Sequence, residues 1–184
     1  MTNNFSQIIL LGALNGVYDL YMDHPVDQID ISILAAMQRL PGASQREIAE
    51  AVNLSQNACW RRIRRMEEAG IIEGRTPRLN REALGLGLVV FTMIRTRHHS
   101  DAWLRSFRAH VAAIPEVVDF FRIGGDYDYM LKIVTADMAG FDSVYRRLIE
   151  GLDLETVTSH FAMEAIAENR PLPVQRAMAT ARRR

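Results

Sequence analysis

Polar side chains of the types that read DNA bases gather between Ser55 and Arg65. Gln56 and Asn57 follow Ser55, a residue type that often begins a helix, and an arginine-rich run follows Trp60. Gln and Asn can each form two hydrogen bonds with adenine and Arg can do so with guanine, while other Arg side chains bind phosphate. A helix in the major groove contacts bases through its N-terminal residues. The predicted DNA-binding residues, which include the start of the preceding helix, are Ser44, Gln45, Ser55, Gln56, Asn57, Trp60, Arg61, Arg62 and Arg65.

This arginine run has a second interpretation, because such runs are often only the solvated face of a helix. Glu67 and Glu68 are close enough along a helix to pair with part of it. Residues 44–82 hold eight Arg against six acidic residues, and the whole chain has 22 basic and 22 acidic residues, so charge alone does not predict DNA binding. Trp60 is also open to two interpretations, either contact with thymine methyl groups and sugars or simple packing. The surrounding hydrophobic pattern has to decide.

That pattern predicts three short helices with the spacing of a helix-turn-helix. The first covers residues 27–40, and its inner positions are Ile29, Ile33, Leu34 and Met37. Ser44 and Glu47 form the capping box that begins the second helix. Ser55 caps the third, which Gly70 ends. Residues 71–79 are predicted to form a short hairpin, which makes the domain a winged type.

The period changes from helical to extended near Leu86. Strands are predicted at 86–96, 117–123, 129–134 and 155–163. Ser100 and Asp137 begin the helices that separate the first two strands and the last two. The order β-α-β-β-α-β predicts a ferredoxin-like unit, so the fold class is α+β. Helices can cover only one face of this sheet, and an apolar second face indicates a dimer.

The glycine loop within this unit, residues 124–128, carries Asp126 and Asp128. Carboxylates can receive an ammonium group, and the N–H groups of a glycine turn can receive a carboxylate. A tight hairpin explains Gly125 and Asp126, but it explains the second aspartate less well.

The chain is accordingly divided into five segments. We expect a disordered leader at 1–25, a helix-turn-helix domain at 26–79, a linker at 80–85, a ferredoxin-like ligand-sensing and dimerisation domain at 86–173, and a basic tail at 174–184. The leader fits neither domain, and Met22 is an alternative start. Alternatively, the leader forms a short helix that docks on the body, and the tail makes an auxiliary contact with DNA.

The composition excludes several classes of protein. Apolar residues make up 48% of the 184 and charged residues 24%, which fits a globular chain rather than a disordered one. Cys59 is the single cysteine, so an intramolecular disulfide is impossible, and its position favours a small core residue over a redox sensor. No apolar run could span a membrane and no positive region precedes an apolar start, so we expect a cytoplasmic protein.

Five segments of the chain resemble motifs of the Lrp/AsnC (feast/famine) transcription regulators. Residues 27–30 are similar to the family's "LDxxD" opening, 54–63 to its recognition helix, 66–72 to its Leu-Glu-x-x-Gly-Ile-Ile motif, 124–129 to its effector loop and 161–164 to its last strand. The motifs occur in the family's order across about residues 27–173.

The sequence departs from the family pattern in three places. Ala58 stands where the family usually has proline, and Arg75 where it often has tyrosine. Residues 151–154 replace the Pro-Gly-Val that precedes the last strand. These differences bear on local detail rather than on the resemblance as a whole.

The resemblance implies a regulator that binds double-stranded DNA as a homodimer through the C-terminal domain, often assembled further. It also implies an amino-acid effector, bound between subunits, and no other cofactor. The matching effector positions are Gly124, Gly125, Asp126, Tyr127, Asp128, Met138 and His160. The stretch of residues 97–138 is similar to a branch that activates cysteine-detoxification genes, which makes cysteine a candidate effector.

The sequence is also open to two other functional interpretations. An architectural protein would organise DNA without a ligand. An enzyme could use Asp126, Asp128 and His160 as acid and base, but nothing marks a nucleophile or a cofactor loop, so no catalytic residue is predicted. The adjacent His98 and His99 lack a third ligand, so no metal site is predicted either.

Overall fold

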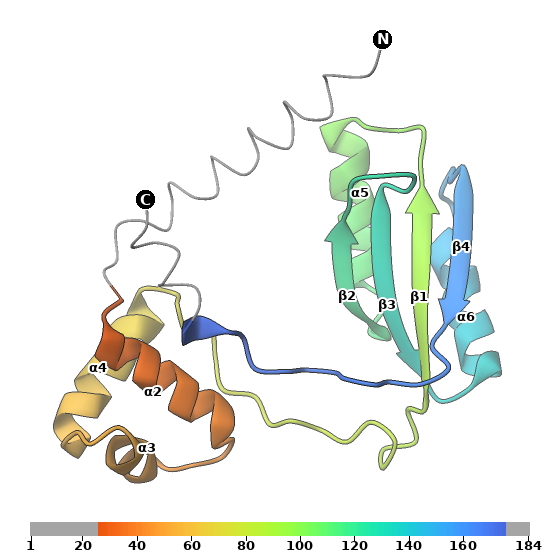
Figure 1. Ribbon diagram of the computed structural model, residues 1–184. Helices are drawn as coiled ribbons and strands as arrows, with labels where there is room; N and C mark the ends of the chain where they lie inside the picture. Colours follow the sequence, from red (N-terminus) through yellow and green to blue (C-terminus); the bar gives the residue numbers. More distant parts are fainter. Residues whose placement is uncertain (1–25, 176–184) are drawn as a thin grey trace. The chain divides into compact units, whose positions relative to one another are not determined.

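The computed structural model describes residues 26–175, which form two compact units (Figure 1). Among the described residues, one unit contains residues 26–78 together with 169–175, and the other is Leu79–Glu168. The predictions made for residues 1–25 and for the last residues of the tail lie outside the described part. Within residues 26–175, no helix is long and apolar enough to cross a membrane.

In the described part of the first unit there are three helices: α2 (Gln28–Arg39), α3 (Gln45–Ala51) and α4 (Gln56–Glu68). Their starts are the predicted ones. The Ser44 hydroxyl accepts the N–H of Glu47, whose carboxylate returns to the Ser44 N–H and completes the capping box. The Ser55 hydroxyl likewise caps α4, and Gly70, with a φ of 69°, ends that helix.

The helices enclose a small apolar core, whose fully buried members are Ile33, Ala36, Ile48, Ala49, Cys59, Ile63 and Met66. Of the predicted inner positions of α2, Ile33 belongs to this core, and Leu34 and Met37 pack against it. Ile29 was assigned wrongly, because its side chain is 40% exposed. Asp30 is fully buried in that first turn, since its carboxylate binds arginines of α4 and so takes the inner position.

The predicted hairpin at 71–79 does not form paired strands. Ile71 and Ile72 donate their N–H groups to the carbonyl of Met66 and pack against the core. The following chain is extended and contains Pro77, which has no N–H for a strand ladder. The segment that follows α4 is therefore an extended arm rather than a paired hairpin.

The second unit has the predicted β-α-β-β-α-β order. Its elements are β1 (Leu88–Arg95), α5 (Asp101–Ala112), β2 (Val117–Arg122), β3 (Tyr129–Thr135), α6 (Met138–Ile149) and β4 (Thr156–Phe161). The four strands lie in the order β2-β3-β1-β4, and all three neighbouring pairs are antiparallel. This is the ferredoxin-like arrangement, and it places β2 and β4 at the edges.

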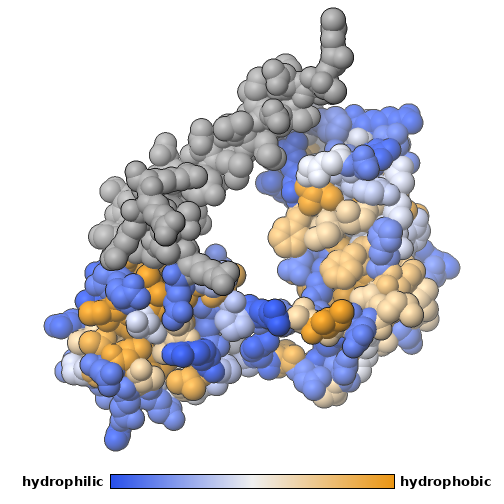
Figure 2. All heavy atoms as spheres, in the orientation of Figure 1, coloured by the Kyte–Doolittle hydropathy of each residue, from blue (hydrophilic) through white to orange (hydrophobic). Residues whose placement is uncertain are grey.

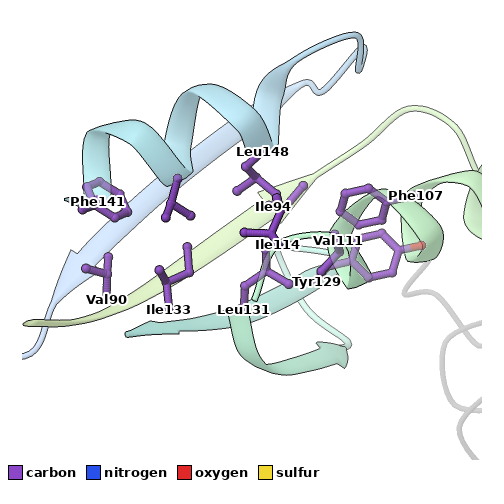
Figure 3. Close-up of a cluster of buried hydrophobic side chains, with 11 residues drawn as sticks. Val90, Ile94, Phe107, Val111, Ile114, Tyr129, Leu131, Ile133, Phe141 and Leu148 are labelled. Atoms are coloured by element: carbon purple, nitrogen blue, oxygen red, sulfur yellow. The ribbon is translucent and has the colours of Figure 1, made fainter. Parts of the chain in front are cut away.

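Helices α5 and α6 cover the same face of the sheet (Figure 1). Figure 3 shows Phe107, Phe141 and Leu148 extending from these helices toward the strands. They meet Val90, Leu131 and Ile133, which are buried in the same core. Because side chains alternate along a strand, the residues between these point to the opposite side.

That opposite side, which we call the open face, is not covered by either helix of residues 79–168. The register pairs Met93 with Met130 and Phe91 with Lys132 on this face. Phe121 is 50% exposed there, and Figure 2 shows apolar side chains at the surface over the strands. The predicted apolar second face is therefore present in the folded unit.

Candidate nucleic-acid interface and glycine loop

One face of helix α4 presents five large polar or aromatic side chains to solvent. They are Gln56, Asn57, Trp60, Arg61 and Arg64, spaced so that they share one side of the helix. We call this set the reading face. Trp60 is 45% exposed and so does not pack in the core. The reading face begins at the helix N-terminus, where free N–H groups and the helix dipole attract phosphate.

Two of the predicted DNA-binding arginines lie on a different side of α4. Arg62 Nη1 is 2.8 Å from Asp30 Oδ1 and 2.6 Å from Asp27 Oδ2. Arg65 Nη2 binds the other oxygen of Asp30. Asp30 also accepts the N–H of Asp27, so its buried carboxylate is held by three donors. These contacts join the start of α2 to the middle of α4.

The charges of this cluster stabilise one another. The N–H of Asp30 and the Arg62 guanidinium lower the pKa of Asp27. The hydrogen bonds to Asp30 and Asp27 raise the pKa of Arg62. Asp27 and Arg62 therefore both stay charged over the ordinary pH range. A buried carboxylate is tolerated only when it is paired and hydrogen-bonded, and Asp30 meets both conditions.

The remaining arginines of α4 differ in how strongly they are held. Arg64 is 3.8 Å from Glu67 and 3.6 Å from Glu68, which is the pairing expected for a solvated helix face. Arg61 is exposed and forms no ion pair within residues 26–175. Weak surface pairs contribute little, so Arg64 can exchange its partners at small cost.

At the start of α3, the predicted residues Ser44 and Gln45 are close to an acidic side chain. Glu47 Oε2 lies 2.7 Å from the Ser44 nitrogen and 2.8 Å from its hydroxyl. These bonds lower the pKa of Glu47, which therefore stays negative. The hydroxyl of Ser44 and its N–H are thus engaged within the protein, and Gln45 is half-buried beside them.

The glycine loop connects β2 to β3. Gly125 has a φ of 123°, which a residue with a side chain rarely adopts. The N–H of Ile123 donates to the carbonyl of Asp128 and closes the turn. Asp128 Oδ2 accepts the N–H of Thr96 at 2.8 Å. The second aspartate of the loop therefore has a structural role, because it ties the loop to the end of β1.

Arg95, which belongs to none of the predicted site residues, lies against the same loop. Its Nε donates to the carbonyl of Asp126 at 2.6 Å, and its guanidinium stands 5.5 Å from the centre of the Tyr127 ring. The Tyr127 hydroxyl donates to Thr158 Oγ1 on β4. The sequence does carry one signal for this residue. Arg95 is the charged residue at the end of a largely apolar strand, in phase with the open face.

Two predicted effector positions are not brought to the loop within one chain. The loop precedes Tyr129, whereas Met138 follows Thr135 at the other end of β3, roughly 20 Å along the strand. His160 pairs with Phe91 near the middle of the sheet. Both side chains are exposed.

Two further candidates have ordinary surroundings. His98 Nε2 lies 3.0 Å from Asp153, and its ring stacks on Trp103. Cys59 is fully buried, and burial raises the pKa of its thiol. A buried neutral thiol fits the predicted core position rather than a redox sensor.

Comparisons with known proteins agree with this geometry. Residues 26–73 match a family model for winged helix-turn-helix DNA-binding domains, and residues 89–172 match the Lrp/AsnC ligand binding domain. The chain is 42% identical over 151 residues to the DNA-binding transcriptional activator DecR of Escherichia coli. The matched region covers 82% of this chain and 99% of that protein.

Two solved structures are similar over most of their length. An AsnC family regulator from Agrobacterium tumefaciens has 39% identity and a TM-score of 0.77, over 82% of this chain and 98% of that one. A regulator from Neisseria meningitidis in complex with L-methionine has 30% identity and a TM-score of 0.74, and the match covers 83% of this chain and 99% of that one. The chain therefore belongs to the Lrp/AsnC family of transcription regulators, as its motifs predict.

Proposed function

We propose that this regulator reads its operator through the reading face of helix α4. The observation that carries the proposal is the separation of the arginines of α4 into two groups. Arg61 and Arg64 project with Gln56 and Asn57, while Arg62 and Arg65 bind Asp30. Gln56, Asn57 and Arg61 are then the candidates for base contacts, and Arg64 for phosphate.

The roles proposed for Arg62 and Arg65 change accordingly. Their contacts with Asp30 fix α4 on α2, so they position the reading face and contribute less to base recognition. Arg65 retains a 55% exposed side chain, which leaves it room for a phosphate contact. Ser44 and Ser55 are proposed to act through their caps, since both hydroxyls accept N–H groups of their own helices.

The experiment that tests the reading face begins with selection of a binding site from random duplex DNA by the wild-type protein. Arg61→Ala is expected to weaken binding to that site by about 1–3 kcal/mol and to relax the preference at one position of each half-site. Arg105→Ala is the control, because Arg105 is an exposed arginine of α5. Wild-type affinity and an unchanged footprint in Arg61→Ala would contradict the proposal.

We also propose that the protein forms a homodimer through the open face of its sheet and that the operator is therefore pseudo-palindromic. Phe91, Met93 and Met130 support the dimer, because a half-buried apolar surface of this kind needs a partner.

For the effector, we propose a small amino acid that binds at the glycine loop. The exposed Asp126 supports this assignment, as does the L-methionine of the Neisseria meningitidis relative. Met138 and His160 can take part only if a second copy supplies them, since they lie away from the loop in their own chain. Cysteine is proposed as the first candidate, on the resemblance to regulators of cysteine detoxification.

Thermal denaturation with each of the twenty amino acids tests this sensing role. A stabilising amino acid that also changes affinity for the selected DNA is the expected result. If none changes either quantity, the protein is a DNA-binding protein without an amino-acid effector, which is the architectural alternative.

A further inference from the structure

We propose that Arg95 is the residue that binds the α-carboxylate of the effector. This inference rests on the proposed effector site at the glycine loop and deepens it. It assigns a role to a side chain for which neither the family resemblance nor the loop motif gives one. It also restricts the ligand to free α-amino acids.

The position of Arg95 is the first argument. It is the last residue of β1, and the strand register places it on the open face, in phase with Met93 and opposite Thr156 of β4. The residue is only partly buried, which leaves it accessible to a ligand. Within residues 26–175, no carboxylate forms an ion pair with Arg95, whereas Arg97 pairs with Glu155 two residues later.

The second argument is that the guanidinium is already oriented. The bond from Nε to the Asp126 carbonyl and the Tyr127 ring hold its plane against the loop. Tyr127 is fixed in turn by its hydrogen bond to Thr158. With Nε engaged, the two terminal nitrogens carry the donors that remain, and a planar fork of this kind matches a carboxylate. An oriented fork loses little conformational freedom on binding.

The third argument is the charge beside it. Arg95 contacts the backbone of Asp126, whose own exposed carboxylate has no hydrogen-bond or ion-pair partner among the described residues. The carboxylate of Asp128 is engaged by Thr96. Within residues 26–175, a cation without an acidic partner at the end of β1 thus lies next to an unpaired carboxylate on the glycine loop. The two charges complement the carboxylate and the ammonium group of a free amino acid.

The test combines a change in the protein with a change in the ligand. The stabilising amino acid from the panel of twenty is measured by calorimetry, together with its α-amide; for cysteine and methionine these are L-cysteinamide and L-methioninamide. In the wild type, loss of the carboxylate is expected to weaken binding about tenfold to a hundredfold. In Arg95→Ala, the amino acid itself should bind that much more weakly, and the amide should bind nearly as weakly as the acid.

Two further variants separate recognition from folding. Arg95→Gln can keep the hydrogen bond to the Asp126 carbonyl without the charge, and it is expected to lose the preference for the acid as Arg95→Ala does. Arg95→Lys keeps a charge and is expected to retain part of the preference. The control Arg105→Ala should bind like the wild type, and the circular dichroism of each variant shows whether it is folded.

Three results would overturn the assignment. If the Arg95 variants bind the amino acid like the wild type, the sensing role stands and the role of Arg95 falls. The same follows if the amide is penalised equally in the wild type and in Arg95→Ala. If no amino acid binds the wild type at all, both the sensing role and this inference fail.

Discussion

Replacing Asp30 with alanine removes the carboxylate that joins helix α2 to helix α4. Three donors then lose their acceptor: the N–H of Asp27 and the guanidinium groups of Arg62 and Arg65. Removing one partner of a fully buried ion pair costs about 3–5 kcal/mol, because the other charge is left unpaired in the interior. That figure is an upper bound here, because the two arginines are not buried.

The exposed fractions set the expected size of the effect. The Arg65 side chain is 55% exposed and can return to water, so its loss costs less than about 1 kcal/mol. The Arg62 side chain is 27% exposed and keeps Asp27 as a partner, so about 1 kcal/mol is expected from it. The lost bond to the N–H of Asp27 adds about 1 kcal/mol. Asp30→Ala should therefore destabilise the first unit by about 2–3 kcal/mol.

Urea denaturation followed by tryptophan fluorescence measures this change. The chain has two tryptophans, so a Trp103→Phe background leaves Trp60 of α4 as the reporter of the first unit. Glu50→Ala is the matched control, because it removes a carboxylate from an exposed pair with Arg46 in the same unit. A control effect of about 0.5 kcal/mol or less is expected. If Asp30→Ala destabilises no more than Glu50→Ala, the account of the cluster is wrong.

Two other predictions concern the open face and acid stability. Met93→Glu puts a charge on the open face, so sedimentation should show that the dimer dissociation constant rises at least about a hundredfold. Ala109→Glu, on α5, is the control. An intact Met93→Glu dimer would exclude this interface. The lowered pKa of Asp27 means that its stabilising contribution is present above the ordinary carboxyl pKa and is lost as the pH falls through the lowered value. Unfolding of the first unit at pH 2–6 should thus show a loss of stability below roughly pH 4 that is smaller in Asp27→Asn, and equal slopes would refute the assignment.

The features that the sequence predicted best are local. Ser44, Ser55, Ser100 and Asp137 each cap a helix within a few residues of themselves, so their types and positions determine the helix starts. The succession of strands and helices along the chain follows in the same way, from the change between extended and helical hydrophobic periods. Local patterns are sufficient there, because the hydrogen bonds that satisfy a helix start come from the same segment.

The features that the sequence did not predict depend on distant contacts. Asp30 meets Arg62 and Arg65 more than 30 positions later, so the choice between a DNA contact and an internal ion pair could not be made from the arginine run. The Arg95 contact with Asp126 spans a similar separation. The hairpin predicted at 71–79 is wrong for a different reason. The residues that favour a turn are present there, but among the described residues no strand pairs with the segment.

The arrangement of the loop and Met138 links the proposed ligand to assembly. In one chain they stand at opposite ends of β3, so an effector that touches both must bind to two copies at once. Such a ligand stabilises the assembled form over the separated one, and assembly must strengthen ligand binding by the same factor. The reading face need not change its shape in this scheme. The spacing and number of reading faces presented to DNA change instead, which alters affinity for an operator with several half-sites through effective concentration.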